Sequence, residues 1–189
     1  MAFDGGDSFA FDPSRTDQDF FELSNENKTI RVKEGGEFVW APVTVPFIEG
    51  VHSWEVRCDK LPLSSDGELV LGNETFSLSG VKPKKEAIAA GIIVFTNKQM
   101  DGKFIGLPQW NNCARRNLNI DFHSGQGIQG PADIVTDGRI RMKFDCEAGV
   151  LSVSPQPDER FIDVVHGVPT PVWFMVGLYY RDAQVTLGE

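Results

Sequence analysis

The sequence predicts an all-β protein, an antiparallel β-sandwich with little or no helix. Short segments along most of the chain alternate apolar and polar residues with period two, which is the pattern of half-buried strands. No stretch of about ten residues or more has apolar side chains at the spacing of an amphipathic helix. The chain also contains 19 glycines and 11 prolines, which suit the turns between many short strands.

The first half of the chain contains five predicted strands. Residues 52–58 are the plainest, because Trp54, Val56 and Cys58 alternate with polar neighbours and therefore share one face. The run at 87–95 is apolar almost throughout, which is typical of a strand buried on both faces. The five segments are residues 29–33, 38–40, 52–58, 68–71 and 87–95.

Five more strands are predicted in the second half. Apolar and charged side chains alternate strictly along residues 139–146. Gly149 suits the left-handed backbone of a tight turn, so the next strand should return antiparallel. The near-continuous apolar run at 172–178 indicates a central strand. The five segments are residues 117–122, 139–146, 150–153, 172–178 and 184–187.

Length and charge divide the chain into an arm and one domain. The 189 residues suffice for a single well-packed domain, and we assign residues 19–189 to it. Residues 1–18 mix aspartate, glycine and serine with three phenylalanines, so we expect a flexible acidic N-terminal arm. An acidic-aromatic docking motif, or phenylalanines that pack back onto the domain, are the alternatives. Residues 1–27 hold −6 of the net charge of −9.

The same composition excludes two classes of partner. The domain body is close to neutral and lacks the basic excess that phosphate binding requires, so we expect no nucleic acid. No segment approaches the ~20 apolar residues that cross a bilayer, so we expect no membrane partner. The first residues do not read as a secretory signal, and the three cysteines fit a reducing compartment. We therefore expect a cytoplasmic protein; its oligomeric state stays open, with a monomer favoured.

No catalytic, cofactor or metal motif stands out. A G-x-G-x-x-G pattern at residues 125–130 precedes Pro131 instead of a helix, so a surface loop is the better interpretation. The three histidines lack the paired spacing of zinc ligands. Glu55 with Asp145 or Glu147 could form a glycosidase dyad, but polar strand faces more often carry solvated carboxylates. We expect no enzyme and no cofactor.

Several motifs occur in a familiar order. A glycine turn leads into a Trp-Glu-Val strand at residues 50–56, and residues 144–152 read apolar-Asp-x-Glu-x-Gly-x-Leu-Ser. Residues 171–174 and 185–187 are apolar closing strands. With residues 21–31, these motifs resemble the SPRY (B30.2-like) domain family over nearly the whole chain after residue 20.

The chain resembles a divergent member of that family. Ser53 stands where an aromatic residue is usual before the motif tryptophan, and Cys146 replaces an aromatic residue of the later hairpin. The segment at residues 68–72 lacks the tryptophan of the family's central strand. The resemblance implies a bent, concanavalin-like sandwich of two sheets that acts as a non-catalytic adaptor for a protein or peptide ligand. Specificity would then depend on the loops between strands.

Candidate binding residues come from two sources. The sequence itself indicates Trp110, in a polar, turn-rich segment, and the cations Arg115 and Arg116, which suit an acidic peptide. The alternative for Trp110 is burial beneath its own loop. From the resemblance come the ligand-facing positions Asp66, Phe95, Asn97, Tyr179, Tyr180 and Arg181.

A second function class remains open at this point. A lectin-like sandwich could stack a sugar on Trp110 and bond it with the neighbouring asparagine and glutamine side chains. The cytosolic features, and the absence of an Asp/Asn cluster for calcium, count against carbohydrate binding. A glycosidase is weaker still for want of a convincing dyad. The sequence therefore favours a protein-interaction module.

Overall fold

The computed structural model describes residues 9–36, 39–60, 65–73, 88–100, 103–114, 134–136, 138–154 and 160–188. For residues 65, 66, 68, 88–100, 103–114 and 134–136 it describes the backbone only. The predicted strand at 117–122 and the glycine pattern at 125–130 lie outside these residues.

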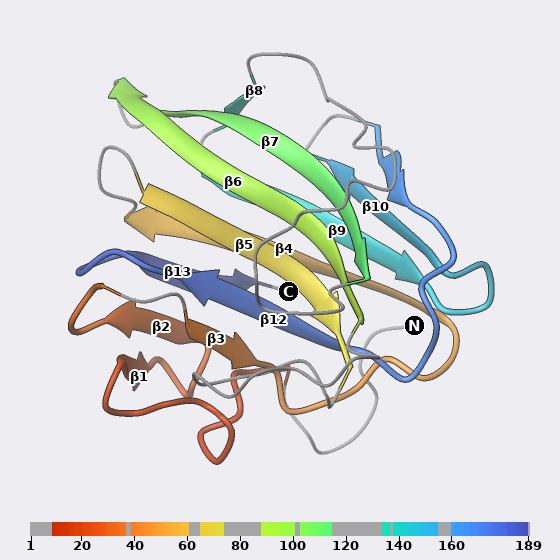
Figure 1. Ribbon diagram of the computed structural model, residues 1–189, viewed down its shortest axis with the longest axis horizontal. Helices are drawn as coiled ribbons and strands as arrows, with labels where there is room; N and C mark the ends of the chain where they lie inside the picture. Colours follow the sequence, from red (N-terminus) through yellow and green to blue (C-terminus); the bar gives the residue numbers. More distant parts are fainter. Residues whose placement is uncertain are drawn as a thin grey trace.

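Two antiparallel sheets form the molecule (Figure 1), and the described residues contain no helix. The seven-stranded sheet consists, in spatial order, of β1 (Phe21–Ser24), β2 (Thr29–Val32), β13 (Gln184–Gly188), β4 (Val51–Lys60), β9 (Arg139–Asp145), β10 (Val150–Ser154) and β11 (Ile162–Val165). The six-stranded sheet consists of β3 (Val39–Pro42), β12 (Trp173–Leu178), β5 (Ser65–Gly72), β6 (Ile88–Met100), β7 (Lys103–Ala114) and β8 (Ile134–Thr136). The all-β sandwich predicted from the sequence is confirmed.

The core lies between the sheets and follows the predicted alternation. In β9, Ile140, Met142 and Phe144 are buried while the charged residues between them are not. Every residue of β12 is buried, as its apolar run predicts for a strand flanked on both sides. An inner aromatic cluster of Phe9, Phe47, Trp54 and Phe174 packs within this core.

Two glycine turns were predicted correctly. Gly149 connects β9 to β10 with φ +63°, and Gly50 precedes β4 with φ +76°. Both values lie in the left-handed region, where a Cβ atom is unfavourable. At Gly149 a Cβ atom would also lie 2.9 Å from the carbonyl oxygen of Val168. Glycine is therefore required there for two independent reasons.

Trp110 does not lie in a loop, so that expectation is wrong. It belongs to β7, where its backbone pairs with that of Ile92 in β6. The local sequence, Pro-Gln-Trp-Asn-Asn, has neither alternation nor strong β-propensity. Pairing along the whole of β6 outweighs that weak local preference, since strand formation depends mainly on the neighbouring strand. β11 was likewise not predicted.

The expected flexible arm over residues 1–18 differs from the structure over residues 9–18. Phe11 is fully buried and forms an isolated antiparallel bridge with Val43 beside β3. Phe9 joins the inner aromatic cluster, and the Arg15 guanidinium lies 4.8 Å from the Trp173 ring centroid. The apolar rings outweigh the acidic composition, so this segment packs on the domain. Residues 1–8 lie outside the described part of the chain.

Candidate functional site

One end of the sandwich brings together several predicted binding residues. Residues 179–182, here called the tyrosine turn, connect β12 to β13 at the left end in Figure 1. The chain from Val32, the last residue of β2, to Gly36 runs alongside it, and three backbone hydrogen bonds link this segment to residues 179–183. They are Gly36 N to Tyr179 O (3.3 Å), Asp182 N to Val32 O (2.9 Å) and Val32 N to Ala183 O (3.0 Å).

Gly35 brings the two segments unusually close. A Cβ atom at this position would lie 2.7 Å from the backbone nitrogen of Arg181 and 2.9 Å from the carbonyl oxygen of Tyr179. No other residue type fits without moving the backbone of the tyrosine turn. The position of Tyr179, Tyr180 and Arg181 therefore depends on a glycine far away in the sequence.

The side chains of the tyrosine turn suit a half-wet surface. Tyr179 and Tyr180 are both partly buried, and their rings meet edge to face with centroids 4.8 Å apart. Arg181 is exposed. A tyrosine ring in this setting can pack against a partner while its hydroxyl group forms a hydrogen bond. Neither tyrosine is fully buried or fully exposed.

Arg31 attaches the tyrosine turn to the seven-stranded sheet. Its guanidinium lies 2.6 Å from a Glu22 carboxylate oxygen and 3.5 Å from one of Asp182. These side chains are roughly half exposed, so each pair contributes at most about 1 kcal/mol to stability. The contribution is mainly to orientation, because Asp182 also holds a left-handed backbone with φ +66°.

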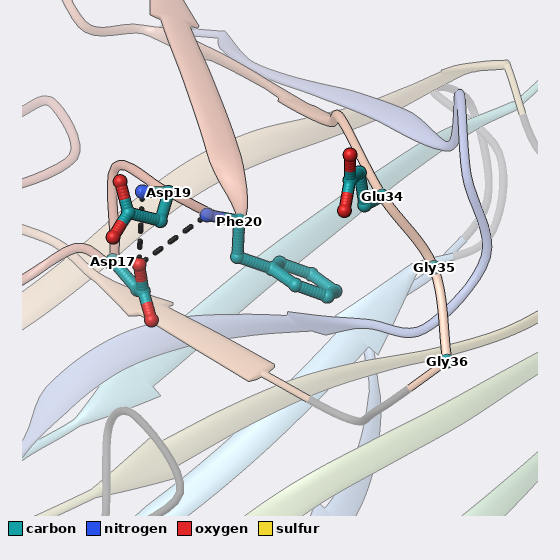
Figure 2. Close-up of a pocket in the computed structure, with 6 residues that line it drawn as sticks. All are labelled: Asp17, Asp19, Phe20, Glu34, Gly35 and Gly36. Atoms are coloured by element: carbon teal, nitrogen blue, oxygen red, sulfur yellow. Dashed lines mark hydrogen bonds between the residues drawn. The ribbon is translucent and has the colours of Figure 1, made fainter.

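A pocket of about 450 Å³ lies next to this turn (Figure 2). Its lining is Asp17, Asp19, Phe20, Glu34, Gly35 and Gly36. One Asp17 carboxylate oxygen accepts hydrogen bonds from the backbone nitrogens of Asp19 (2.9 Å) and Phe20 (3.3 Å). In Figure 2 the Phe20 ring lies between the two aspartates and Glu34. We call this the acidic pocket.

The acidic pocket has the chemistry of a cation site. Three acidic residues line it together with Phe20, which is only 6% exposed, and the lining contains no basic side chain. The Lys33 amine lies close by, where it donates a hydrogen bond to the carbonyl oxygen of Gln18. A lysine or arginine side chain entering the pocket would meet carboxylate acceptors. Sequence reasoning missed this site because Asp17 and Asp19 read as part of a solvated acidic arm. The pair Gly35-Gly36 beside Glu34 was the only local signal of a close approach.

Three further predicted residues reach the same end of the six-stranded sheet. Leu178, the last residue of β12, pairs with Gly67 in β5. Asp66 and Phe95 are cross-strand partners one residue beyond Gly67. Asn97 follows within β6 at a register shift between Thr96 and Lys98. The backbone thus brings Asp66, Phe95 and Asn97 to the end of the six-stranded sheet at which β12 continues into the tyrosine turn.

Trp110 is not part of this end. Trp110 lies in β7, three strands from β12, or roughly 14 Å away at the usual strand spacing. Its partner Ile92 lies two residues before Val94, which pairs with Gly67. The structure therefore separates Trp110 from the tyrosine turn. Arg115 and Arg116 lie outside the described residues.

The candidate glycosidase dyad does not form. Glu55 faces Arg141 in the β4–β9 ladder, whereas Asp145 faces Val51. The four-residue offset separates the two carboxylate-bearing positions by about 13 Å along the strands. Glycosidase carboxyl groups lie roughly 5–9.5 Å apart. The described part of the chain also contains no group of three or more His, Cys, Asp and Glu residues placed to hold a metal ion.

The two cysteines whose side chains the structure describes, Cys58 and Cys146, are poor nucleophiles. Burial, reinforced by the Asp59 carboxylate, raises the pKa of the Cys58 thiol to about 12. Burial also raises the pKa of Cys146, together with the carboxylates of Asp145, Glu147 and Glu49. The thiolate is the reactive form, so both side chains are largely unreactive near neutral pH.

The Cys58 thiol should make stability depend on alkaline pH. Because its pKa is raised by folding, the neutral thiol's contribution is complete below pH 9 and is lost as pH rises toward 12. We expect the free energy of unfolding to fall more steeply across this range in the wild type than in Cys58→Val. Urea unfolding of both proteins at several pH values measures the difference. Parallel pH profiles would contradict the burial of this thiol.

Comparison with known proteins identifies the architecture. No protein-family model and no curated protein matches the sequence. Among solved structures, the PSpry domain of TRIM65 superposes with a TM-score of 0.62 at 15% identity, covering 96% of this chain and 92% of that one. The SPRY domain of human HERC1 gives 0.62 at 12% identity, covering 95% and 98%.

The two antiparallel sheets place this chain in the class of two-sheet β-sandwiches. Within that class, the fold of this chain is that of a SPRY domain. The resemblance seen in the sequence motifs is therefore confirmed at the level of fold. Within the described ranges, no helix has the length and apolar character needed to span a bilayer.

Proposed function

We propose that this protein is a non-catalytic interaction module that recognises a peptide or a protein surface at the end carrying the tyrosine turn and the acidic pocket. The close approach of Gly35 to the backbone of Arg181 and Tyr179 carries the proposal, because it joins the two features into one surface. Asp66, Phe95 and Asn97 extend this surface along the adjoining sheet edge.

The chemistry of the surface favours a partner with a basic side chain. Tyr179 and Tyr180 offer packing area and hydroxyl groups, which are typical of interface residues. The acidic pocket beside them offers three carboxylates. A peptide could place a lysine or arginine in the acidic pocket and pack its neighbouring residues on Tyr179 and Tyr180. Such a peptide would use both features of the surface.

Several observations support a role without catalysis. Glu55 is offset by four residues from Asp145, and Glu147 lies in the turn beyond Asp145, so neither candidate dyad forms. The thiols of Cys58 and Cys146 have raised pKa values. The resemblance of the sequence motifs to SPRY domains also implies protein recognition. A cytoplasmic location remains part of the proposal, on the cysteine content described above. A monomeric state is also part of the proposal.

A random-peptide display library selected on the immobilised full chain tests the proposal. We expect enrichment of peptides that carry lysine or arginine, and retention reduced at least tenfold by Glu34→Lys or Tyr180→Ala. Such a loss corresponds to about 1.4 kcal/mol of binding free energy. Quantitative pulldown from cell lysate with the same variants then identifies the natural partner.

Glu147→Lys is the matched control. It makes the same charge change on an exposed residue in the β9–β10 turn, at the opposite end of the sandwich (Figure 1). This variant should retain the selected peptides. Equal loss in Glu147→Lys and Glu34→Lys would show a general effect of charge and refute the proposed surface. Saturable binding on a glycan array, with no peptide enriched, would support carbohydrate recognition instead.

A further inference from the structure

The first described residues, 9–12, are held in a groove at the edge of the six-stranded sheet. We call it the N-terminal groove; its walls are Asn27, the segment 42–44 and the rings of Phe47, Trp54 and Phe174. Three backbone hydrogen bonds fix the segment: Thr44 N to Ala10 O (2.9 Å), Phe11 N to Asn27 O (2.8 Å) and Asp12 N to Pro42 O (2.9 Å). The groove therefore binds residues 10–12 through their backbone, as in strand addition, with one antiparallel bridge between Phe11 and Val43.

Each of the four side chains has a distinct environment. Phe9 is half-buried, with its ring centroid 6.1 Å from that of Trp54 and 6.4 Å from that of Phe174. Ala10 is buried, and Phe11 is completely buried in the core. The Asp12 carboxylate accepts hydrogen bonds from the backbone nitrogen (2.8 Å) and hydroxyl (2.7 Å) of the serine two residues later. The groove thus fits an apolar residue followed by Ala-Phe-Asp.

The same pattern occurs a second time in the chain. Residues 2–4 are also Ala-Phe-Asp, and Met1 before them is apolar like Phe9. Methionine is flexible enough to fill a space shaped for another apolar side chain. Asp4 is followed two residues later by Gly6, whose backbone nitrogen can donate to an aspartate carboxylate as that of Ser14 does. Residues 1–8 lie outside the described chain, so only their sequence enters here.

We propose that residues 1–4 are an alternative ligand of the N-terminal groove within the same chain. When they occupy it, residues 9–12 leave, and the connection from the groove to Asp17 lengthens from four residues to twelve. Loop-closure entropy rises only slowly with loop length, so this change is tolerated. The chain can then release residues 9–16 without leaving the groove empty and the core exposed.

Residues 9–12 are the main occupant in the wild type. The Phe9 ring makes aromatic contacts that Met1 would lack, and Arg15 stacks 4.8 Å from the Trp173 ring centroid only when the short connection is in place. The alternative should therefore become populated when Phe11 is removed. The measurement of this expectation is thermal unfolding and not peptide binding, so it can fail while the proposed binding surface stands, and the reverse.

Thermal unfolding of four full-length proteins tests the proposal: wild type, Phe3→Ala, Phe11→Ala and the double variant. Phe3→Ala should leave the Tm of the wild type unchanged. In the Phe11→Ala background the same change should lower the Tm by a further ~4 °C or more, because each 1 kcal/mol of stability shifts the Tm by about 2–4 °C in a domain of this size. Equal Tm values for Phe11→Ala and the double variant would overturn the proposal, as would a Phe11→Ala protein with no cooperative transition.

A peptide added in trans gives a second measurement. The end-blocked peptide Met-Ala-Phe-Asp should raise the Tm of the double variant with increasing concentration, because a ligand of the folded state stabilises it. The peptide Met-Ala-Ala-Asp is the matched control and should have no effect. If neither peptide shifts the transition, or if both do so equally, the groove does not recognise the first copy of the sequence.

Discussion

Phe174→Ala is expected to lower the free energy of unfolding by about 3–5 kcal/mol, the range for deletion of a buried aromatic ring. Phe174 is fully buried in β12, and its ring centroid lies 5.1 Å from that of Trp54 and 6.4 Å from that of Phe9. β3 and β5 flank it, so the surrounding backbone is fixed by hydrogen bonds and cannot close the cavity. Urea unfolding measures the change.

Phe161→Ala is the matched control, since it removes the same atoms from a different environment. Phe161 is partly exposed on the outer face of the seven-stranded sheet, where Arg141 and Lys143 each lie 5.1 Å from its ring centroid. Its loss should cost about 1 kcal/mol, as for exposed cation–π contacts. Similar losses in both variants would contradict the position of Phe174 at the centre of the core.

The same packing explains which parts of the fold were predictable. In β9 and β4 one face is buried and the other is not, so burial leaves a period-two signature in the sequence. β12 is buried on both faces and leaves an apolar run. β7 has neither signature, because its ladder with β6 supplies the stabilisation that its own residues do not reveal. The packing of residues 9–12 on the domain was not predicted, for a related reason. Burial of Phe9 and Phe11 outweighs the acidic composition only when the folded domain provides the N-terminal groove.

The candidate site was predictable in part. Tyr179, Tyr180 and Arg181 could be named because they end a recognisable apolar strand of the SPRY pattern. The acidic pocket could not, since Asp17 and Glu34 are neighbours only through the pairing of β1 with β2 and the hydrogen bond from Lys33 N to Phe20 O (2.8 Å). Such a long-range approach has no local sequence signal beyond the glycine that permits it.

Gly35→Ala is expected to destabilise the protein by about 1–3 kcal/mol, as overpacking does, and to weaken peptide binding at least tenfold. The new Cβ atom would lie 2.7 Å from Arg181 N and 2.9 Å from Tyr179 O, so one backbone segment must move. That movement shifts Tyr179 and Tyr180 relative to the acidic pocket. Every side chain of the proposed surface stays chemically intact. Urea unfolding and titration of a selected basic peptide measure the two effects separately.

Gly36→Ala is the control that separates strain from displacement. A Cβ atom at Gly36 would meet nothing within 4 Å, although its φ of +127° disfavours any side chain. This variant should lose stability, by about 1 kcal/mol, yet retain the peptide, because nothing pushes the tyrosine turn away. If both variants bind the peptide as the wild type does, the tyrosine turn and the acidic pocket do not act as one surface. If both lose it, stability of the loop, and not the close approach at Gly35, controls recognition.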